Sequence, residues 1–447
     1  MNGPRLSSLW SRVLRDYTTL LVLLLLCAAL SVMTLDRQHP VGAAAGRQLA
    51  RMLASELEQG EGVLIVVSNI RQDRELAAEL GKQLAQSQLK VVDTVQGQPA
   101  DARRAIEAAL AAGQEIDAIA CTDATSTWSL LDRLDEKFPG IGSPRIVRPQ
   151  SYLWPNFLKA SNLLNIANQI AVIAIVAIGM TMVIVGGGID LSVGSLIALS
   201  SVLTALLIRE AAGGYQASAL GIVLASLGAI AACAAVGALT GTLVAHVRIQ
   251  PFIVTLALMS IGRGAAYLLS EGESVYQIPA SVKWLGAGAD LGIPNAVVLM
   301  IGLYVLADLV MKRTVFGRHL YAVGGNPAAA HLCGIPVRRM LLWTYVITAA
   351  LAGLAGVILT SQFQSGSPKF GENYELQVIA AVVVGGTSLT GGVGKMFGTL
   401  QGALTIAVVH NGMNLLGLGG HPQAVILGVV ILLAALLDRL KSFWVRA

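Results

Sequence analysis

Charged residues are scarce in this chain of 447 residues. Asp, Glu, Lys and Arg make up only 13% of it, against roughly a quarter of an average soluble protein. Hydrophobic residues reach 55%, and the mean hydropathy is +0.68. So little charge excludes an ordinary soluble domain and indicates a membrane protein. The net charge of +5 is then explained by Lys and Arg that hold loops on the cytoplasmic side, so we expect no nucleic acid partner.

Cysteine is scarce too, and its spacing excludes two kinds of site. The four cysteines, Cys27, Cys121, Cys233 and Cys333, form no closely spaced pairs. Neither a disulfide framework nor a zinc site follows from such spacing. We therefore expect no metal site in this chain.

Long apolar runs, in contrast, are frequent. The first, residues 18–35, follows several arginines and has no small-residue cleavage site after it, so it predicts a retained membrane span with a cytoplasmic N-terminus. Nine later runs after residue 159 raise the expected number of spans to ten. Lys and Arg at 312–318, at 338–339 and near the C-terminus then fall in cytoplasmic segments, as the positive-inside rule requires.

A charged segment interrupts this pattern between residues 37 and 158. Short apolar runs such as GVLIVVSN alternate there with helical patterns such as RELAAELGKQLAQ, which predicts a parallel sheet covered by helices. The expected fold is an all-α polytopic membrane protein of about ten transmembrane helices with an inserted extracytoplasmic α/β domain. The expected boundaries are 1–36 for the N-terminus and first span, 37–158 for the insert and 159–447 for the transmembrane domain.

The stretch MTMVIVGGGIDLSVGSLIAL, residues 180–199, places three glycines and a carboxylate within an apolar run. Residues 163–208 are long enough for two crossings, so the glycines predict a helix break, with a new helix starting at Leu191. Asp190 then accepts hydrogen bonds from the first turn of that helix. Alternatively, Asp190 and Ser192 line an aqueous path at a discontinuous helix.

The segment VFGRHLYAVGGNPAAAHLCGIPVRR lies in the longest predicted cytoplasmic loop, residues 312–340. Asn326 suits a helix N-cap, Pro327 the first helical position and Gly334 the position after the helix. This predicts an isolated helix of about seven residues. A helix so short needs a surface to pack on, and a groove on a transport ATPase would provide one. A plain surface helix is the alternative.

Two charged residues are expected deep in the membrane. Arg263 lies about 18 Å above the inner face, at 1.5 Å per helical residue, where an unpaired cation is costly. Glu375 matches it in depth, so we expect the two to pair, directly or through water. The alternative is an arginine that snorkels to the outer headgroups.

Two further polar groups lie near the C-terminus. The segment GGTSLTGGVGK, 385–395, departs from the phosphate-binding pattern because Met396 stands where Ser or Thr is needed. Its Thr387 and Ser388 are assigned to a tight membrane turn. The cluster His410, Asn411 and Asn414 either forms hydrogen bonds between helices or lines a path for a polyol.

Four segments together carry a resemblance to a known family. GMTMVIVGGGIDLSVGS, QPFIVTLALMSIGRG, GRHLYAVGGNPAAAHLCGI and YELQVIAAVVVGGTSLTGGVG resemble the permease subunits of bacterial ATP-binding-cassette importers for ribose, xylose, arabinose and galactose. The resemblance runs from about residue 162 to the C-terminus. Where the family commonly has two asparagines, this chain has His410 followed by Asn411.

The resemblance implies a bacterial inner-membrane permease that imports a pentose or hexose by alternating access and works as a homodimer or heterodimer. Its partners would be two cytoplasmic ATPase subunits, which carry the Mg-ATP, and a periplasmic sugar-binding protein. The chain itself would bind no cofactor and catalyse no reaction. Both termini would be cytoplasmic and residues 37–158 periplasmic. The ATPases would dock on the coupling loop, at Gly325, Asn326, Pro327, Ala328, Ala329, Gly334 and Ile335.

The insert departs from the family, whose first external loop is usually short. Residues 61–150 resemble one lobe of a periplasmic sugar-binding protein, with Asp123 at the position of a ligand-contacting aspartate. A lone lobe lacks half of such a site. Ligand contact, docking of a receptor and a vestigial role all remain open.

Two other functions are less consistent with the sequence. A stand-alone secondary carrier or channel would be expected to have a chain of intramembrane acids, which this sequence does not show. A membrane-tethered sensor would need far fewer spans than ten.

Overall fold

The computed structural model describes residues 6–446, and the side chains from residue 20 to residue 430 together with 432, 433 and 436. Residues 1–5 and 447, which include part of the predicted cytoplasmic N-terminus, lie outside the described residues. The chain divides into two compact units: one holds the segments Met1–Thr34 and Asn156–Ala447, and the other Leu35–Pro155. The boundaries expected from the sequence, after residues 36 and 158, lie two and three residues later.

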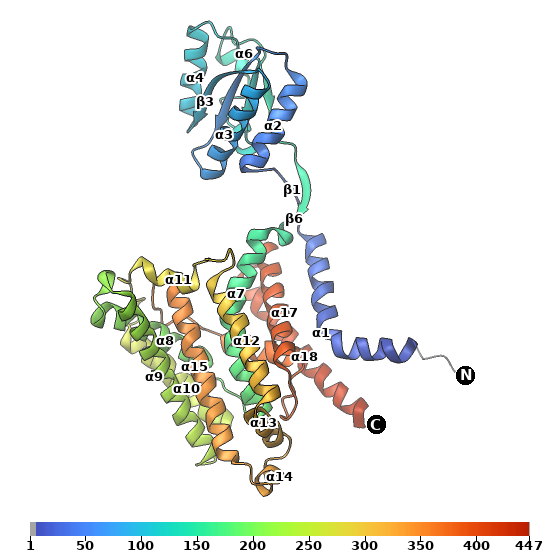
Figure 1. Ribbon diagram of the computed structural model, residues 1–447, viewed down its shortest axis with the longest axis vertical. Helices are drawn as coiled ribbons and strands as arrows, with labels where there is room; N and C mark the ends of the chain where they lie inside the picture. The colour runs from blue at the N-terminus through green and yellow to red at the C-terminus, as the bar shows by residue number, and fades with distance from the viewer. Residues whose placement is uncertain (1–5, 447) are drawn as a thin grey trace. The chain divides into compact units, whose positions relative to one another are not determined.

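The helical unit contains ten long or apolar helices (Figure 1). They are α1 (Leu6–Met33), α7 (Ala160–Val185), α8 (Val193–Leu206), α9 (Ala219–Ala245), α10 (Pro251–Leu269), α12 (Asn295–Arg313), α15 (Val337–Phe363), α16 (Tyr374–Val384), α17 (Met396–Leu415) and α18 (Gly420–Arg446). Short elements connect them: η1 (Asn156–Leu158), η2 (Leu207–Ala211), η3 (Gly214–Gln216), η4 (Ala280–Val282), α11 (Lys283–Gly286), α13 (Val315–Gly325) and α14 (Pro327–Leu332).

Six helices within the described residues are long and apolar enough to cross a bilayer: α7, α8 with its extension to Ala211, α9, α10, α12 and α15. The count of ten spans stays a prediction. Helix α16 is the shortest of the ten and ends at Val384. At 1.5 Å per residue its 11 residues cover about 17 Å of a hydrocarbon layer of about 30 Å.

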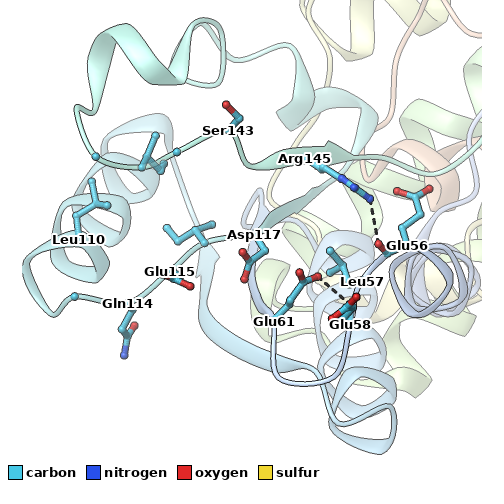
Figure 2. Close-up of a pocket in the computed structure, with 15 residues that line it drawn as sticks. Glu56, Leu57, Glu58, Glu61, Leu110, Gln114, Glu115, Asp117, Ser143 and Arg145 are labelled. Atoms are coloured by element: carbon cyan, nitrogen blue, oxygen red, sulfur yellow. Dashed lines mark hydrogen bonds between the residues drawn. The ribbon is translucent and has the colours of Figure 1, made fainter.

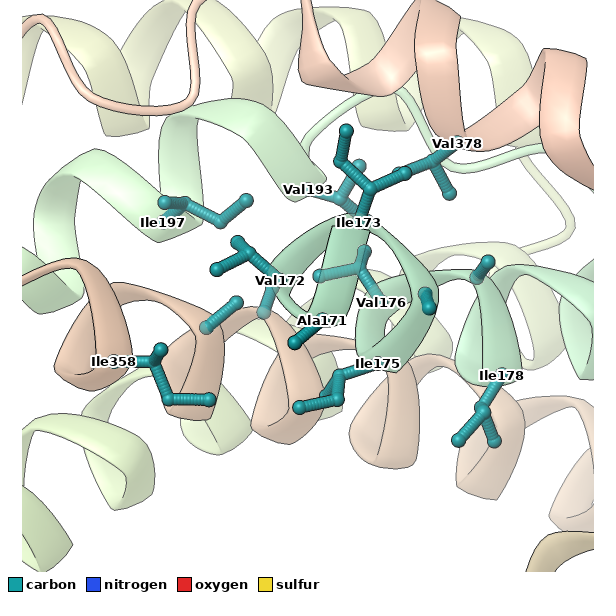
Figure 3. Packing of buried hydrophobic residues seen from close by; sticks show 14 of the residues in the cluster. Ala171, Val172, Ile173, Ile175, Val176, Ile178, Val193, Ile197, Ile358 and Val378 are labelled. Atoms are coloured by element: carbon teal, nitrogen blue, oxygen red, sulfur yellow. The ribbon is translucent and has the colours of Figure 1, made fainter. Parts of the chain in front are cut away.

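Helix α7 forms the centre of the helical unit. It packs against α12, α15, α16 and α17, and 89% of its most apolar 18-residue window is buried, against 17% for α9. Figure 3 shows the reason: residues such as Val172 and Ile175 project from all sides of α7 toward Ile197 of α8, Ile358 of α15 and Val378 of α16. Helices α7 and α9 are both strongly apolar, so the difference lies in their position: α7 is enclosed by other helices, while α9 lies at the periphery of the unit with its apolar surface uncovered.

Small residues set the distances between these helices. A Cβ atom at Gly179 of α7 would collide with Thr348 of α15. Close contact through small residues is how membrane helices pack when lipid supplies no hydrophobic drive. Helix α1 packs on α17 in the same way, where Leu30 covers Gly412.

The unit Leu35–Pro155, here called the lobe, contains a parallel four-stranded sheet in the order β3-β2-β4-β5. The strands are β2 (Gly62–Val67), β3 (Lys90–Gln96), β4 (Ala118–Cys121) and β5 (Arg145–Val147). Helices α2 (Gly42–Glu56) and α3 (Arg71–Gln86) pack on one face, where Ile65 is buried; α4 (Pro99–Ala111) packs on the other, over Leu64. The short helices α5 (Asp123–Ser126) and α6 (Leu134–Lys137) follow β4.

A separate two-stranded ribbon stands at the ends of the lobe's sequence. Strand β1 (Leu35–Gln38) pairs antiparallel with β6 (Tyr152–Pro155), so that Leu35 faces Pro155. The ribbon follows α1 directly and leads into η1 and α7. The chain of the lobe therefore lies between α1 and α7, and its two ends are paired as strands.

Candidate functional site

Four helices meet at one end of the helical unit and enclose a cleft of about 480 Å³. The start of α7 lies there beside the end of α15, the start of α16 and the end of α17. Most of the lining side chains are carboxamides. The lining consists of Asn162, Asn165, Asn168, Gln169, Leu359, Gln362, Phe363, Tyr374, Asn411, Asn414 and Leu415. We call it the carboxamide cleft.

Some of these amides hold the helices together. Asn162 and Asn411 exchange two hydrogen bonds, of 3.0 and 2.8 Å between nitrogen and oxygen, and so join α7 to α17. Gln362 donates to Asn168 Oδ1 at 3.3 Å and joins α15 to α7. The part of the amide cluster that was predicted to bond between helices therefore does so at Asn411.

Other amides in the cleft have free hydrogen-bonding capacity. Asn165 and Gln169, one turn apart on α7, are exposed and make no side-chain hydrogen bond within the described part of the chain. Asn414 is also exposed; its Nδ2 lies 3.4 Å from His410 Nδ1, and its Oδ1 accepts a hydrogen bond from Gln423. A carboxamide offers both donors and acceptors without charge, which suits the hydroxyl groups of a neutral polyol.

A smaller hollow adjoins the cleft and shares Gln169 and Tyr374 with it. It is lined further by His410 and Gln377, with aliphatic side chains behind them. The side chain of Tyr374 is therefore placed between the two hollows. An amphipathic ring beside amides resembles the usual composition of a small-molecule site, in which a few polar groups fix orientation against apolar walls.

The break predicted between α7 and α8 is confirmed. Helix α7 ends at Val185, and Gly187 adopts φ +84°, a conformation that a side chain disfavours. The next helix starts at Val193, two residues later than the expected Leu191. Asp190 is buried and accepts hydrogen bonds from Ser192 N at 2.9 Å and Ser192 Oγ at 2.6 Å. It thus orders the entry to α8 as expected, although its partner is the residue before the helix.

Arg263 and Glu375, which were expected to pair directly or through water, do not pair directly, and a pairing through water stays a prediction. Within the described residues they form no ion pair; instead, Arg263 donates to the main-chain carbonyls of Pro368, Phe370 and Gly371, at 2.7, 2.9 and 3.3 Å. Glu375 is half-buried, its Oε2 has no hydrogen-bond partner in the described part, and it lies against Gly194. An irregular segment thus satisfies the guanidinium with backbone oxygen.

The segment 385–395 forms a tight turn, as predicted from its glycines. Gly386 and Gly391 adopt positive φ, and Ser388 Oγ lies 2.9 Å from Thr390 Oγ1. Thr387 is buried, and its hydroxyl makes no hydrogen bond within the described residues. Neither Thr387 nor Ser388 lines the carboxamide cleft.

The isolated helix predicted in the loop 312–340 is confirmed as α14. Asn326 Oδ1 accepts the hydrogen bond of Ala329 N at 3.0 Å, Pro327 opens the helix, and Gly334 follows it at φ +80°. Ala330 is its one buried residue, while Leu332 is 88% exposed. Gly325, Ala328 and Ala329 are exposed, and Ile335 is half-buried. The structure thus presents a short helix with an uncovered apolar side chain.

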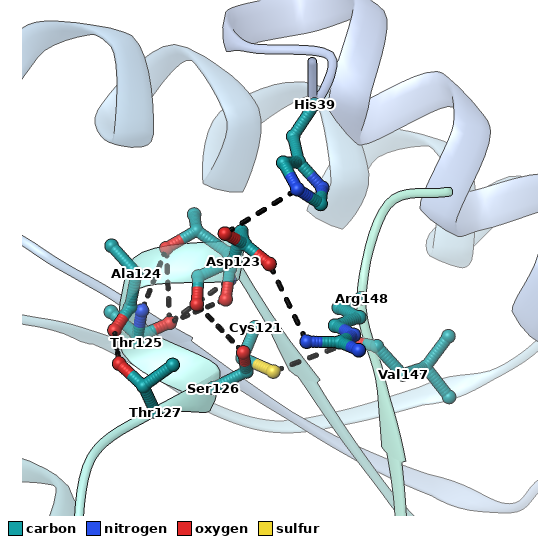
Figure 4. Close-up of polar contacts among 10 residues, drawn as sticks. His39, Cys121, Asp123, Ala124, Thr125, Ser126, Thr127, Val147 and Arg148 are labelled. Atoms are coloured by element: carbon teal, nitrogen blue, oxygen red, sulfur yellow. Dashed lines mark hydrogen bonds and ion pairs between the residues drawn. The ribbon is translucent and has the colours of Figure 1, made fainter. Parts of the chain in front are cut away.

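In the lobe, Asp123 follows β4 at the carboxyl edge of the parallel sheet, where α/β folds bind their ligands. Its two carboxylate oxygens face nitrogen atoms of side chains in the same lobe: His39 Nε2 lies at 3.5 Å and Arg148 Nη1 at 3.4 Å (Figure 4). His39 directly follows β1, and Arg148 directly follows β5. Asp123 is therefore contacted by one residue that follows the connecting ribbon and by one that follows the edge strand of the sheet.

A hollow of about 720 Å³ lies at the opposite edge of the lobe's sheet (Figure 2). It is lined by residues that precede or begin strands, such as Glu61, Asp117 and Arg145, and by the end of α2. Asp117 there accepts a hydrogen bond from Gly62 N at 2.7 Å. No group of three or more metal-binding side chains is found among the residues described.

One pattern in the sequence indicates the carboxamide cleft. Asn162, Asn165 and Asn168 recur every three residues in SNLLNIANQ. That spacing places the three amides along one side of α7. The contributions of Gln362 and Tyr374 could not be recognised in this way, because they come from helices far away in the chain.

The helical unit is similar in sequence to known transport proteins. Residues 162–435 match the family model described as branched-chain amino acid transport system / permease component. The ribose import permease protein of Escherichia coli strain K12 is 44% identical over 296 residues, which cover 65% of this chain and 90% of that protein. No solved structure matched.

Two further relatives are also sugar permeases by name. The ribose import permease protein of Bacillus subtilis strain 168 is 42% identical over 306 residues, 68% of this chain and 92% of that protein. The L-arabinose ABC transporter permease protein of Azospirillum brasilense is 37% identical over 293 residues, 66% of this chain and 84% of that protein. The lobe lies wholly outside the residues matched by the family model. The chain therefore belongs to the family of ABC transporter permeases, which are transport components.

Proposed function

We propose that this chain is the membrane-spanning subunit of an ATP-driven importer that carries a monosaccharide, a pentose or hexose, across the bacterial inner membrane. The observation that carries this proposal is the carboxamide cleft, which lies inside the family-matched region of a chain whose relatives are named ribose and arabinose permeases. Uncharged donors and acceptors bind hydroxyl groups without retaining an ion.

The proposed mechanism is alternating access driven from outside this chain. The start of α7, whose residues line the cleft, lies at one end of the helical unit, and α14 lies at the other (Figure 1). ATP and magnesium are held by a separate ATPase subunit, which docks on α14, and this chain binds no cofactor. Movement of α14 then changes the packing of the helices around the cleft, so that the sugar site opens first to one side of the membrane and then to the other.

A second permease copy completes the proposed path. Asn165 and Gln169 are exposed on the single chain, and exposed amides facing lipid would be costly because lipid offers them no partner. A partner copy or a water-filled passage shared with it would remove that cost. A periplasmic sugar-binding protein delivers the sugar, and the lobe, also periplasmic, contacts that receptor or the sugar itself.

Reconstitution tests the function directly. The purified chain is placed in vesicles with the cognate ATPase and sugar-binding protein, and uptake of labelled ribose, arabinose and a branched-chain amino acid is compared. ATP-dependent uptake of a sugar and not of the amino acid is expected. Uptake by the chain alone, without ATPase, would instead identify a stand-alone carrier.

Cysteine labelling tests the proposed orientation. Cys333, at the end of α14, is exposed, whereas Cys121 is buried in the lobe, and burial raises the pKa of its thiol to about 12. Because a thiol of such high pKa carries almost no thiolate at neutral pH, Cys121 is expected to stay unlabelled in the native protein. A membrane-impermeant maleimide should label Cys333 in inverted vesicles and spare it in intact spheroplasts. Labelling in intact spheroplasts would contradict the orientation.

A further inference from the structure

The end of α7, the helix α13 and the turn 385–395 meet at one point. Val185 O, at the end of α7, accepts a hydrogen bond of 2.9 Å from Gly392 N of the turn. Gly324 of α13 lies against the same two atoms, so closely that a Cβ at this position would collide with both. Three segments that are distant in sequence therefore touch backbone to backbone, with no side chain between them.

Neighbouring side chains reinforce this contact. Tyr321 Oη donates a hydrogen bond of 2.7 Å to Gly394 O, which fixes α13 to the turn. Leu320 is completely buried and packs beside Gly186, at the break after α7. Helix α13 thus contacts both interruptions of the membrane helices: the break that holds Asp190 and the turn that holds Thr387. We call the contact of Val185, Gly324 and Gly392 the backbone joint.

The joint is connected to α14 without an intervening loop. Asn326 is at once the residue that ends α13 and the N-cap of α14. Its side chain fixes the start of α14 through Ala329 N. A displacement of α14 is therefore imposed on the end of α13, because no flexible residues separate the two helices to absorb it.

We propose that the backbone joint transmits the displacement of α14 to the two interrupted membrane segments, which makes Gly324 a positioning residue for transport. Close-packed atoms pass on a shift because packed cores have discrete arrangements and low compressibility. Backbone contact does so without the rotamer freedom that a side chain would add. This proposal rests on the proposed function, since it assumes that a separate ATPase moves α14.

The test compares ATP hydrolysis with sugar uptake in the full complex in vesicles. Gly324→Ala inserts a methyl group into the joint, while Gly302→Ala, on the exposed face of α12 with no atom near its added methyl, is the control. Gly324→Ala is expected to raise the number of ATP molecules hydrolysed per sugar about tenfold, within the usual range of coupling between two sites. An unchanged ratio, or uptake and hydrolysis that fall in step, would overturn the proposal.

A milder variant covers the case in which Gly324→Ala fails to assemble. Tyr321→Phe keeps the ring and removes the hydrogen bond to Gly394 O. Since one hydrogen bond contributes about 1 kcal/mol, the number of ATP molecules hydrolysed per sugar is expected to increase about threefold to fivefold. No increase would contradict the proposed role of the backbone joint. Failure of the proposed function gives a different result, because the wild-type complex itself would then show no sugar-dependent ATP hydrolysis. In that case the proposed role of the backbone joint would also be wrong.

Discussion

Replacing Asn165 and Gln169 together by leucine is expected to lower sugar uptake about a hundredfold at limiting sugar concentration. Each amide that binds a sugar hydroxyl contributes about 1 to 1.5 kcal/mol, which corresponds to about tenfold for one residue. Both side chains are exposed in the carboxamide cleft, so their replacement leaves the packed core intact. The measurement is the initial rate of labelled sugar uptake in the reconstituted complex, over a range of sugar concentrations.

Controls separate sugar binding from other effects of these substitutions. Leu163→Ala changes an exposed side chain on the same part of α7 that does not line the cleft, and its uptake should stay within about twofold of wild type because isolated surface changes have small effects. Size-exclusion chromatography of the double variant checks that a second copy still assembles.

Unchanged uptake by the double variant would show that Asn165 and Gln169 do not bind sugar. If Asn165 and Gln169 simply face lipid, leucine would suit that environment better and raise the melting temperature, and uptake would not change. That outcome would remove the carboxamide cleft from the sugar path. The reciprocal pair of Asn162 and Asn411 would then remain as a purely structural contact between α7 and α17.

Features that depend on neighbouring residues in the chain could be predicted from the sequence. The N-cap of α14 requires a side-chain oxygen and a nearby N–H group, and both lie within Asn326–Ala329. The break after Val185 likewise depends on adjacent glycines. In such cases the residue types that create the geometry stand together in the sequence, so their pattern is readable.

Features that depend on tertiary packing could not be predicted in this way. Arg263 was assigned a charged partner by depth alone, whereas the structure satisfies it with carbonyl oxygens of residues 368–371. A main-chain acceptor is present at every residue and so leaves no trace in the sequence. The carboxamide cleft was predicted only at Asn411 and Asn414, for a related reason: only the meeting of α7, α15, α16 and α17 brings the other amides to these two.

Leu332 is another residue that sequence reasoning did not select. It lies within α14, between the predicted coupling residues Ala329 and Gly334, and is 88% exposed. Single exposed apolar side chains are common on protein surfaces, but this one stands on the six-residue helix predicted to dock the ATPase, where a partner that covers it would remove apolar area from water. We therefore expect Leu332 to enter the groove of the ATPase subunit.

Leu332→Asp is expected to weaken binding of the ATPase about a hundredfold and to abolish ATP-dependent sugar uptake. The change removes an apolar contact and places an unpaired carboxylate in a desolvated groove, which together cost about 3 kcal/mol. The affinity is measured by titrating labelled ATPase onto the purified chain. The melting temperature of the variant should match wild type, because so exposed a side chain contributes little to the chain's own packing.

Leu332→Met provides the matched control, since it keeps an apolar side chain of similar volume and should bind the ATPase within about threefold of wild type. Normal binding by Leu332→Asp would show that the ATPase does not cover this side of α14. If that variant also imported sugar without any ATPase, the driving force would have to come from within the chain itself. The backbone joint would then have no external movement to transmit, so this one substitution tests the assumption that links α14 to the cleft.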